Sequence, residues 1–366
     1  MALGWDRALA WRMRRHLLEP ATAESAEDVV SRLVAVVAKS APLAELAVAL
    51  RRRDPVPGEL AAALAAGRVV KTYAFRGATH LMTPEQAAVH LALRTASRMW
   101  ELPSWQEYYG LAPEDWPELR DVVRQALAGG PLTREELADA VAPRYPRLRE
   151  PIVSGNDTLL KPLAWQGVLC FGPVRDGRST LAALETNPRW PGLRDLDDVG
   201  PRALRSYLHA YGPARADRLQ YWLGEGLGVP RRRLRAWLAA LEDVTTVDVD
   251  GEAHLVLRAD EEDLGTSTAT GAVRLLPGHD QWVLGPGTAD LRVVPPARRA
   301  VVTRGANVVV TGGVVAGTWR AGHDGVTVRW FPEAGAPPHD LLEEQAVRVA
   351  ALLGRPQRVS VRVADD

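Results

Sequence analysis

Lys39 stands out among the residues able to take part in chemistry, because the sequence holds only three lysines. Apolar residues recur at helical spacing from Val29 to Val37, so the pattern predicts a helix whose last turn holds Lys39. A cation there faces the negative end of the helix dipole. A break at Ser40 then predicts a second helix over residues 43–53. Taken alone, the pattern favours a surface lysine that stabilises a helix end.

The other reactive residue types exclude several kinds of chemistry. Cys170 is the single cysteine, so an intrachain disulfide and a multi-cysteine zinc site are excluded, and its apolar neighbours predict a buried, inert thiol. The eight histidines show no spacing typical of metal ligands. The sequence contains no G-x-G-x-x-G after a strand, no Walker A motif, no G-x-S-x-G and no H-E-x-x-H. We therefore expect neither a cofactor nor a metal.

Composition indicates a soluble protein with an uneven charge distribution. The 366 residues suffice for two to four domains, and no apolar run approaches the roughly 18 residues of a membrane span. The arginine-rich N-terminus fits neither a signal peptide nor an anchor, so the expected location is the cytoplasm. Residues 1–100 hold 14 Lys and Arg against 9 Asp and Glu, whereas residues 101–200 hold 11 against 16. A basic stripe in the first third favours a nucleic-acid partner.

The order of predicted elements repeats three times along the chain. Each repeat reads as three helices followed by a β-hairpin, which is the order of a winged helix, a helix-turn-helix variant. A capping box at Thr133 and an Asp250-Gly251 turn are the clearest local signals. The predicted winged-helix units cover residues 1–106, 113–189 and 200–266, joined by linkers at 107–112 and 190–199.

The last part of the chain, residues 272–366, has a different character. Short apolar runs separated by Gly and Pro predict strands, and a single amphipathic helix is expected over residues 340–353. The predicted strands cover residues 273–276, 282–284, 300–303, 307–311, 314–319, 325–330 and 358–363. We therefore predict an α+β protein with three tandem winged-helix units and a small C-terminal β-barrel.

Several segments, in order along nearly the whole chain, resemble one known family. These segments are LAWRMRR (9–15), AELAV (44–48), VKTYAFRGATHL (70–81), GVLCFGP (167–173), YGPA (211–214), LLPGHDQWVLG (275–285) and VAGTWR (315–320). Together they resemble the AlkZ/YcaQ winged-helix DNA glycosylases, which remove bulky and crosslinked alkylpurines. The resemblance implies tandem winged helices with a C-terminal β-barrel, which matches the order of elements above. It also implies a cofactor-free monomer acting on double-stranded DNA.

The resemblance implies an active site at Val37-Ala38-Lys39. There the family carries Gln-apolar-Gln or Gln-apolar-Asp, whose polar side chains position the water that attacks C1′. Valine forms no hydrogen bond with water, and a protonated lysine repels a cationic N7-alkylguanine. Lys39, neutralised by burial, is then expected to hold the water or to attack C1′ itself. The other catalytic candidates are Val37, Glu45, His16, His80 and Asp280, the last paired with His279. Gly278-His279 also departs from the aromatic residue usual before this Asp, which favours a pocket for a larger lesion.

Three functions remain open from the sequence. The first is a monofunctional glycosylase that excises a bulky N7-guanine adduct formed by a DNA-alkylating natural product, and so acts in self-resistance. The second is an inactive relative that binds adducts or DNA as a sensor or regulator. The third is a transcription factor, which three units in one chain fit less well.

The expected DNA contacts are mostly arginines. They are Arg12, Arg15, Arg68, Lys71, Arg76, Arg231, Arg232, Arg233, Arg235, Trp319 and Arg320. The aromatic stretch 99–109 is expected either to stack on an unpaired base or to pack between domains.

Overall fold

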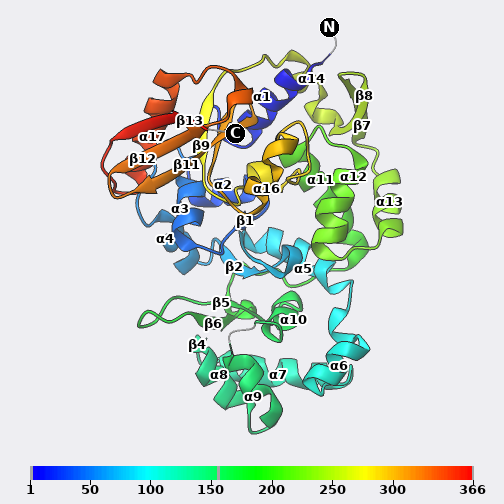
Figure 1. The fold of residues 1–366 in the computed structure, drawn as a ribbon. Helices are drawn as coiled ribbons and strands as arrows, with labels where there is room; N and C mark the ends of the chain where they lie inside the picture. The colour runs from blue at the N-terminus through cyan, green and yellow to red at the C-terminus, as the bar shows by residue number, and fades with distance from the viewer. Residues whose placement is uncertain (1–2, 155–156, 365–366) are drawn as a thin grey trace. The chain divides into compact units, whose positions relative to one another are not determined.

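A computed structural model describes residues 3–154 and 157–364, and its fold is shown in Figure 1. The chain forms two compact units, which are described separately. Unit 1 consists of Met1–Leu60, Arg205–Trp222 and Leu241–Asp366, and unit 2 consists of Ala61–Leu204 and Leu223–Ala240. Both contain helices and strands, which confirms the predicted α+β class. These units do not test the four-part division of the chain, which stays a prediction. In the described part of the chain, no helix has the length and apolarity that a membrane span requires.

The N-terminal segment of unit 1 corrects the prediction for Lys39. Helix α2 (Ala26–Leu33) ends earlier than expected, because Val34 has a φ of 69°, which turns the chain out of the helix. A short strand, β1 (Val36–Val37), follows, as suits β-branched side chains. The helix predicted through Lys39 is therefore wrong. Lys39 lies in a bend before α3 (Ala41–Ala49), in whose first turn a proline stands.

The other helices and the hairpin of unit 1 come from distant parts of the sequence. Helix α1 spans Trp5–Arg15, and α12 and α14 span Ala216–Leu219 and Glu261–Thr266. Helices α4 (Glu59–Ala65) and α11 (Leu196–Tyr211) each cross the division between the units. Strands β7 (Val244–Val249) and β8 (Glu252–Leu257) pair antiparallel. Their turn contains Asp250 and Gly251, both at positive φ, which confirms the predicted hairpin.

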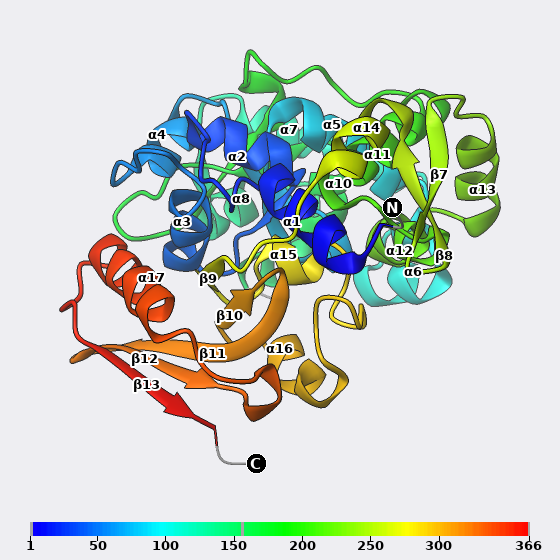
Figure 2. The same cartoon turned by 90° about the horizontal axis from the view of Figure 1, so that it is seen from above.

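The C-terminal part of unit 1 is an open five-stranded sheet. Its strands are β9 (Val273–Leu276), β10 (Val308–Thr311), β11 (Val314–Gly322), β12 (Gly325–Trp330) and β13 (Val359–Val363), in the order β13-β12-β11-β10-β9. The pairs are antiparallel except β12–β13. Helix α17 (His339–Leu352) packs against this sheet, as Figure 2 shows. The two edge strands, β9 and β13, do not pair with each other, so the described residues form no closed barrel where one was expected.

Two segments predicted as strands in this region are short helices. They are α15 (Gln281–Leu284) and α16 (Arg299–Thr303). The β-branched valines in both segments favoured a strand prediction. In α15, the carboxylate of Asp280 accepts the backbone N–H of Trp282 at 2.8 Å, and this cap starts a helical turn instead.

One hydrophobic core joins both ends of unit 1. Leu9 and Met13 of α1 and Leu46 of α3 pack in the same cluster as Trp282 and the valines of the C-terminal sheet. The first sixty residues therefore depend on the last hundred for burial of their apolar faces.

Unit 2 is built around another antiparallel sheet. Its strands run in the order β3 (Thr79–Met82), β2 (Val70–Tyr73), β5 (Leu169–Phe171), β6 (Thr180–Ala183) and β4 (Leu132–Thr133). The predicted hairpins at residues 68–82 and 168–182 are both present, and Lys71 pairs with Phe171 to join them in one sheet.

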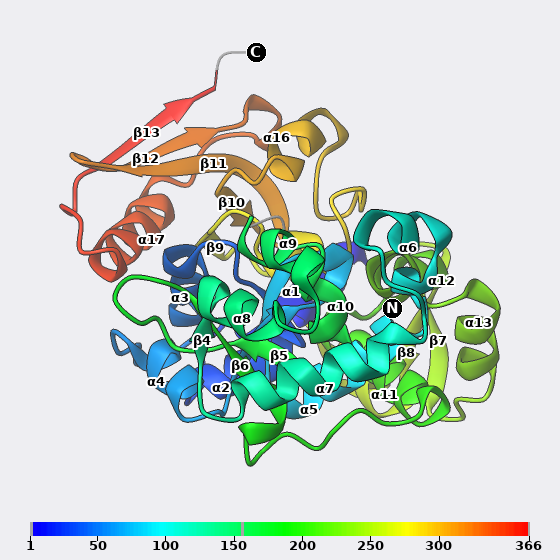
Figure 3. The same ribbon diagram turned by 90° about the horizontal axis from the view of Figure 1, so that it is seen from below.

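The helices of unit 2 are α5 (Pro84–Thr95), α6 (Pro103–Tyr109), α7 (Asp115–Leu127), α8 (Arg134–Val141), α9 (Arg149–Val153), α10 (Leu160–Trp165) and α13 (Arg231–Ala239). Figure 3 shows α7, α8 and α9 grouped near β4 and β6. Thr83 caps α5, and the capping box of Thr133 and Glu136 is complete at the start of α8.

Candidate active site

The strand that carries Val37 borders a small cavity within unit 1. Its volume is ≈ 10 Å³, about what one water molecule needs. The apolar wall consists of Leu33, Val36, Val37, Leu43, Ala47 and Pro277. The remaining lining comes from Gly278, His279, Asp280 and Gln281, the segment that follows β9. The structure therefore places the position implied by the resemblance directly beside the polar residues of the 275–285 segment.

Asp280 is held in a buried ion pair with Arg51. Both side chains are completely buried, and the two guanidinium nitrogens lie 2.7 and 2.9 Å from the two carboxylate oxygens. Asp280 also accepts the backbone N–H of Trp282, and Arg51 donates to the carbonyl oxygens of His16 and Ala47 at 3.0 and 2.8 Å. These contacts occupy both carboxylate oxygens. They favour a role in which Asp280 fixes the 277–281 segment against α3.

Gln281 is a polar lining residue that reasoning from the sequence missed. It is 1% exposed, and its Oε1 lies 3.3 Å from the hydroxyl of Tyr211, which also lies 2.7 Å from the carbonyl oxygen of Leu33. Its Nε2 has no hydrogen-bond partner among the described residues. The two ends of an amide exchange by a half-turn, so Gln281 binds Tyr211 with one end and presents a donor or an acceptor with the other. A buried amide end without a partner costs about 1–3 kcal/mol, which a water molecule in the cavity would relieve.

His279 is the second polar group of this lining, and its environment keeps it neutral. Its pKa is lowered from the usual 6.5, first by partial burial and then by the positive charge of Lys39. The ring also lies close to Gly305, where an added Cβ would come within 2.3 Å of Nε2. A glycine at 305 therefore permits this position of the imidazole. A neutral imidazole near pH 7 can accept a proton from a water molecule.

Lys39 itself is exposed, contrary to the expectation that burial would neutralise it. It is close enough to His279 for its charge to act on the ring. The structure thus brings together Val37, Lys39, His279 and Asp280 of the predicted set, and adds Gln281. The sequence offered no signal for Gln281 beyond its place next to Asp280 in a matching segment.

The other three catalytic candidates have surroundings that favour structural roles. His16 is fully buried between the rings of Tyr211 and Trp282, each 5.1 Å away, and burial holds its pKa well below 6.5. Glu45 accepts the backbone N–H groups of Gly58 and Leu60 at the start of α4, and burial raises its pKa. His80 lies in unit 2, buried on β3, with its Nδ1 2.9 Å from the carbonyl oxygen of Ala78.

The residues expected to contact DNA differ in how far they are exposed to solvent. Arg76, Arg231, Arg232, Arg235 and Arg320 are exposed, and Arg68, Lys71 and Arg233 are half-buried. Lys71 stacks on the ring of Phe171 at 4.9 Å, and burial lowers its pKa. Arg15 pairs with Asp260 at 2.9 Å. Trp319 is buried and donates to the carbonyl oxygen of Leu276, so its expected contact with DNA finds no support in this position.

The aromatic stretch 99–109 also divides by exposure. Trp100 is buried with its ring centroid 6.1 Å from that of Trp116, whereas Tyr108 is 71% exposed. Packing therefore explains the first, and Tyr108 remains available for stacking.

The described residues offer no obvious metal centre. Among them, no group of three or more His, Cys, Asp or Glu side chains is arranged to hold a metal ion. Cys170 is buried, which raises its pKa to about 12 and confirms the predicted inert thiol.

Comparison with known proteins gives one consistent result. The family described as "DNA glycosylase AlkZ-like" matches residues 30–352. The chain is 37% identical to an interstrand DNA cross-link repair glycosylase of Streptomyces sahachiroi, over 99% of this chain and 100% of that protein. It is also similar to the solved structure of the Streptomyces sahachiroi DNA glycosylase AlkZ, with a TM-score of 0.92, 36% identity and complete coverage of both chains.

Proposed function

The chain belongs to the AlkZ-like DNA glycosylase family, and from this premise we propose that it excises bulky N7-alkylated guanines from duplex DNA, including those in interstrand crosslinks. The observation that carries this proposal is the water-sized cavity beside Val37, with a neutral imidazole and a buried amide in its lining. These two groups supply the hydrogen-bonding functions that valine cannot.

The departing base needs little help from the enzyme in this reaction. An N7-alkylated guanine is already cationic, so when the bond between N9 and C1′ breaks, the bonding electrons neutralise the departing base. The water oxygen forms the new bond to C1′. Gln281 holds the water, and His279 accepts its proton. The products are a free adducted guanine and an abasic site, which is the outcome of a monofunctional glycosylase.

Lys39 acts in this mechanism as a positioning residue. Its positive charge opposes protonation of His279 and so preserves the base. Its side chain is exposed and so lacks the apolar pocket that can activate a lysine as a nucleophile. If Lys39 attacked C1′ instead, borohydride would trap a covalent complex with DNA that Lys39→Ala abolishes. We expect no such complex.

The biological setting follows from the substrate class. Adducts of this kind arise from DNA-alkylating natural products, so we propose a role in self-resistance through base excision repair. The proposed enzyme is a cytoplasmic monomer that needs no cofactor.

The test is incubation of the protein with a panel of duplexes followed by an abasic-site endonuclease, which breaks the strand at an abasic site without heat or alkali. Each duplex is also treated without the protein, to measure spontaneous loss of the base. The panel contains a bulky N7-alkylguanine monoadduct, an interstrand N7-guanine crosslink and an undamaged control. Breaks at the adducted guanines alone would support the proposal. Tight binding to adducted duplex without any break would favour the inactive sensor instead.

A further inference from the structure

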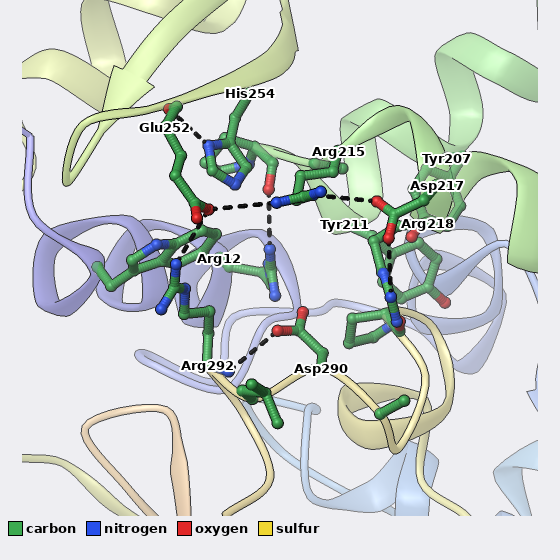
Figure 4. Close-up of a pocket in the computed structure, with 16 residues that line it drawn as sticks. Arg12, Tyr207, Tyr211, Arg215, Asp217, Arg218, Glu252, His254, Asp290 and Arg292 are labelled. Atoms are coloured by element: carbon green, nitrogen blue, oxygen red, sulfur yellow. Dashed lines mark hydrogen bonds and ion pairs between the residues drawn. The ribbon is translucent and has the colours of Figure 1, made fainter.

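A second, larger pocket lies within unit 1 and is shown in Figure 4. It is formed by α1, α11, residues 213–218, β8 and the loop at residues 286–292. Its volume of ≈ 290 Å³ is near the lower end of the range for small-molecule sites, roughly 300–1,000 Å³. None of its lining residues lines the cavity beside Val37. The pocket therefore suits a compact group other than the attacking water.

The charged side chains of this pocket leave one positive charge in excess. Its four arginines are Arg12, Arg215, Arg218 and Arg292, and its three carboxylates are Asp217, Glu252 and Asp290. Arg215 and Arg218 share Asp217, at 3.2 and 2.9 Å. Arg215 and Arg292 share Glu252, at 3.6 and 3.0 Å. Arg215, Arg218 and Arg292 thus form ion pairs with only two carboxylates.

Arg12 forms the buried part of the wall and keeps an unused donor. It is 2% exposed, and its Nε and Nη2 donate to the carbonyl oxygens of Gly212 and Pro213 at 3.3 and 3.0 Å. Its Nη1 has no hydrogen-bond partner among the residues described. Asp290 opposes the effect of burial on the pKa of Arg12, yet no described contact joins the two as an ion pair. A buried guanidinium with a spare N–H attracts an anion strongly, because little water screens it.

We propose that this pocket binds one phosphodiester group of the DNA backbone, an inference that rests on the proposed function. A phosphodiester carries a single negative charge, which balances the single excess positive charge. A phosphate monoester carries about 1.5 to 2 negative charges near pH 7 and fits less well. Guanidinium groups bind phosphate oxygens through two parallel hydrogen bonds. The side chains of Arg215 and Arg292 are 55% and 38% exposed, so they are within reach of a backbone at the mouth of the pocket.

The test measures binding of an undamaged, fluorescein-labelled duplex by anisotropy over a series of salt concentrations. Arg218→Gln and Arg292→Gln are each expected to weaken binding and to lower the slope of log K against log salt by about 1. Asp217→Asn removes a competing carboxylate and is expected to strengthen binding. The matched control is Arg205→Gln, since Arg205 pairs with Asp243 in the same unit and does not line the pocket. Thermal unfolding of each variant checks that it is folded.

A competition assay distinguishes a phosphodiester of the DNA backbone from a free phosphate or nucleotide as the group that binds in the pocket. Inorganic phosphate and dGMP, titrated against the wild-type complex, are expected to displace the duplex no better than the same ionic strength of chloride. Pocket variants that bind the duplex like Arg205→Gln would overturn the inference. So would specific displacement by inorganic phosphate or dGMP. Because the duplex is undamaged, a failure of base excision would leave these readings unchanged, and the two proposals can fail separately.

Discussion

At the scale of single residues, the cavity beside Val37 is lined by polar side chains other than the pair that the family resemblance implies at residues 37–39. Val37 contributes only an apolar wall, whereas His279 and Gln281 approach the same space from a segment more than two hundred residues away. In the proposed mechanism, His279 and Gln281 therefore supply the polar groups that Val37 lacks.

The first prediction concerns His279. His279→Gln keeps a polar side chain but removes the base, so the rate constant for excision should fall by about 10²- to 10⁴-fold. The measurement is single-turnover excision at saturating enzyme. The control is His323→Gln, because His323 is exposed in the turn between β11 and β12. Equal rates for both variants would remove His279 from the mechanism.

The second prediction concerns pH. Only the neutral form of His279 accepts a proton, and its pKa lies below 6.5, so kcat/KM should be level near pH 7 and fall as the pH drops through that lowered pKa. Lys39→Met removes a charge that lowers the pKa, so the midpoint of the fall should move upward towards 6.5. Burial remains the larger cause, which makes this shift partial. A midpoint unchanged in Lys39→Met would contradict the positioning role of Lys39.

At the scale of elements, the buried pair of Arg51 and Asp280 determines where residues 277–281, the segment of the proposed base, lie. It fixes the start of α15 against α3, although the two residues are 229 positions apart. His279 and Gln281 flank this anchor on either side. The position of the proposed base therefore depends on an ion pair that takes no part in the chemistry.

The third prediction tests this anchor. Asp280→Asn leaves Arg51 buried without a counter-charge and should lower the free energy of unfolding by about 3–5 kcal/mol. Adding Arg51→Met should recover part of the loss, because the stranded charge is then gone. Urea unfolding gives both values. The exposed pair of Arg205 and Asp243 serves as the control, for which loss of the arginine should cost no more than about 1 kcal/mol.

Local signals in the sequence predicted elements well where a specific turn or cap was involved. The capping box at Thr133 and the hairpin at Asp250-Gly251 are found as expected. Periodicity failed at residues 34–39, because the positive φ of Val34 is an unusual conformation for a β-branched residue, and nothing in the pattern indicates it. The strand prediction for the segment of α15 is wrong because the carboxylate of Asp280 caps a helical turn there, and the contact with Arg51 that holds this carboxylate is not visible in the local pattern.

Only part of the candidate site could be predicted from the sequence. Resemblance identified the strand of Val37 and the segment containing Asp280, but not that they border one cavity. Gln281 was missed because its unpaired amide is a property of packing, and spacing does not record it.

At the scale of the whole molecule, the N-terminal helices depend on the C-terminal sheet for their stability. Unit 1 combines three segments of the sequence, and Leu9, Met13 and Leu46 share a core with the C-terminal sheet. The N-terminal helices on either side of Lys39 are therefore not expected to be stable without that sheet.

The fourth prediction follows from this shared core. Deleting residues 268–366 should unfold α1 to α3, because their apolar faces would lose their partners. The expected result is loss of helical circular dichroism and rapid proteolysis before residue 60. Deleting only residues 355–366, which removes the edge strand β13, should leave these helices protected. Equal protection in the two truncated proteins would contradict the dependence.

The most direct test of the proposed activity is mass spectrometry of the small molecules released in a single turnover from a duplex that carries a bulky N7-guanine monoadduct. The proposed chemistry breaks only the bond between N9 and C1′, so the wild-type protein should release adducted guanine and leave an abasic site, and His279→Gln should do so far more slowly. A duplex that remains fully adducted in the presence of bound, folded wild-type protein would contradict the account.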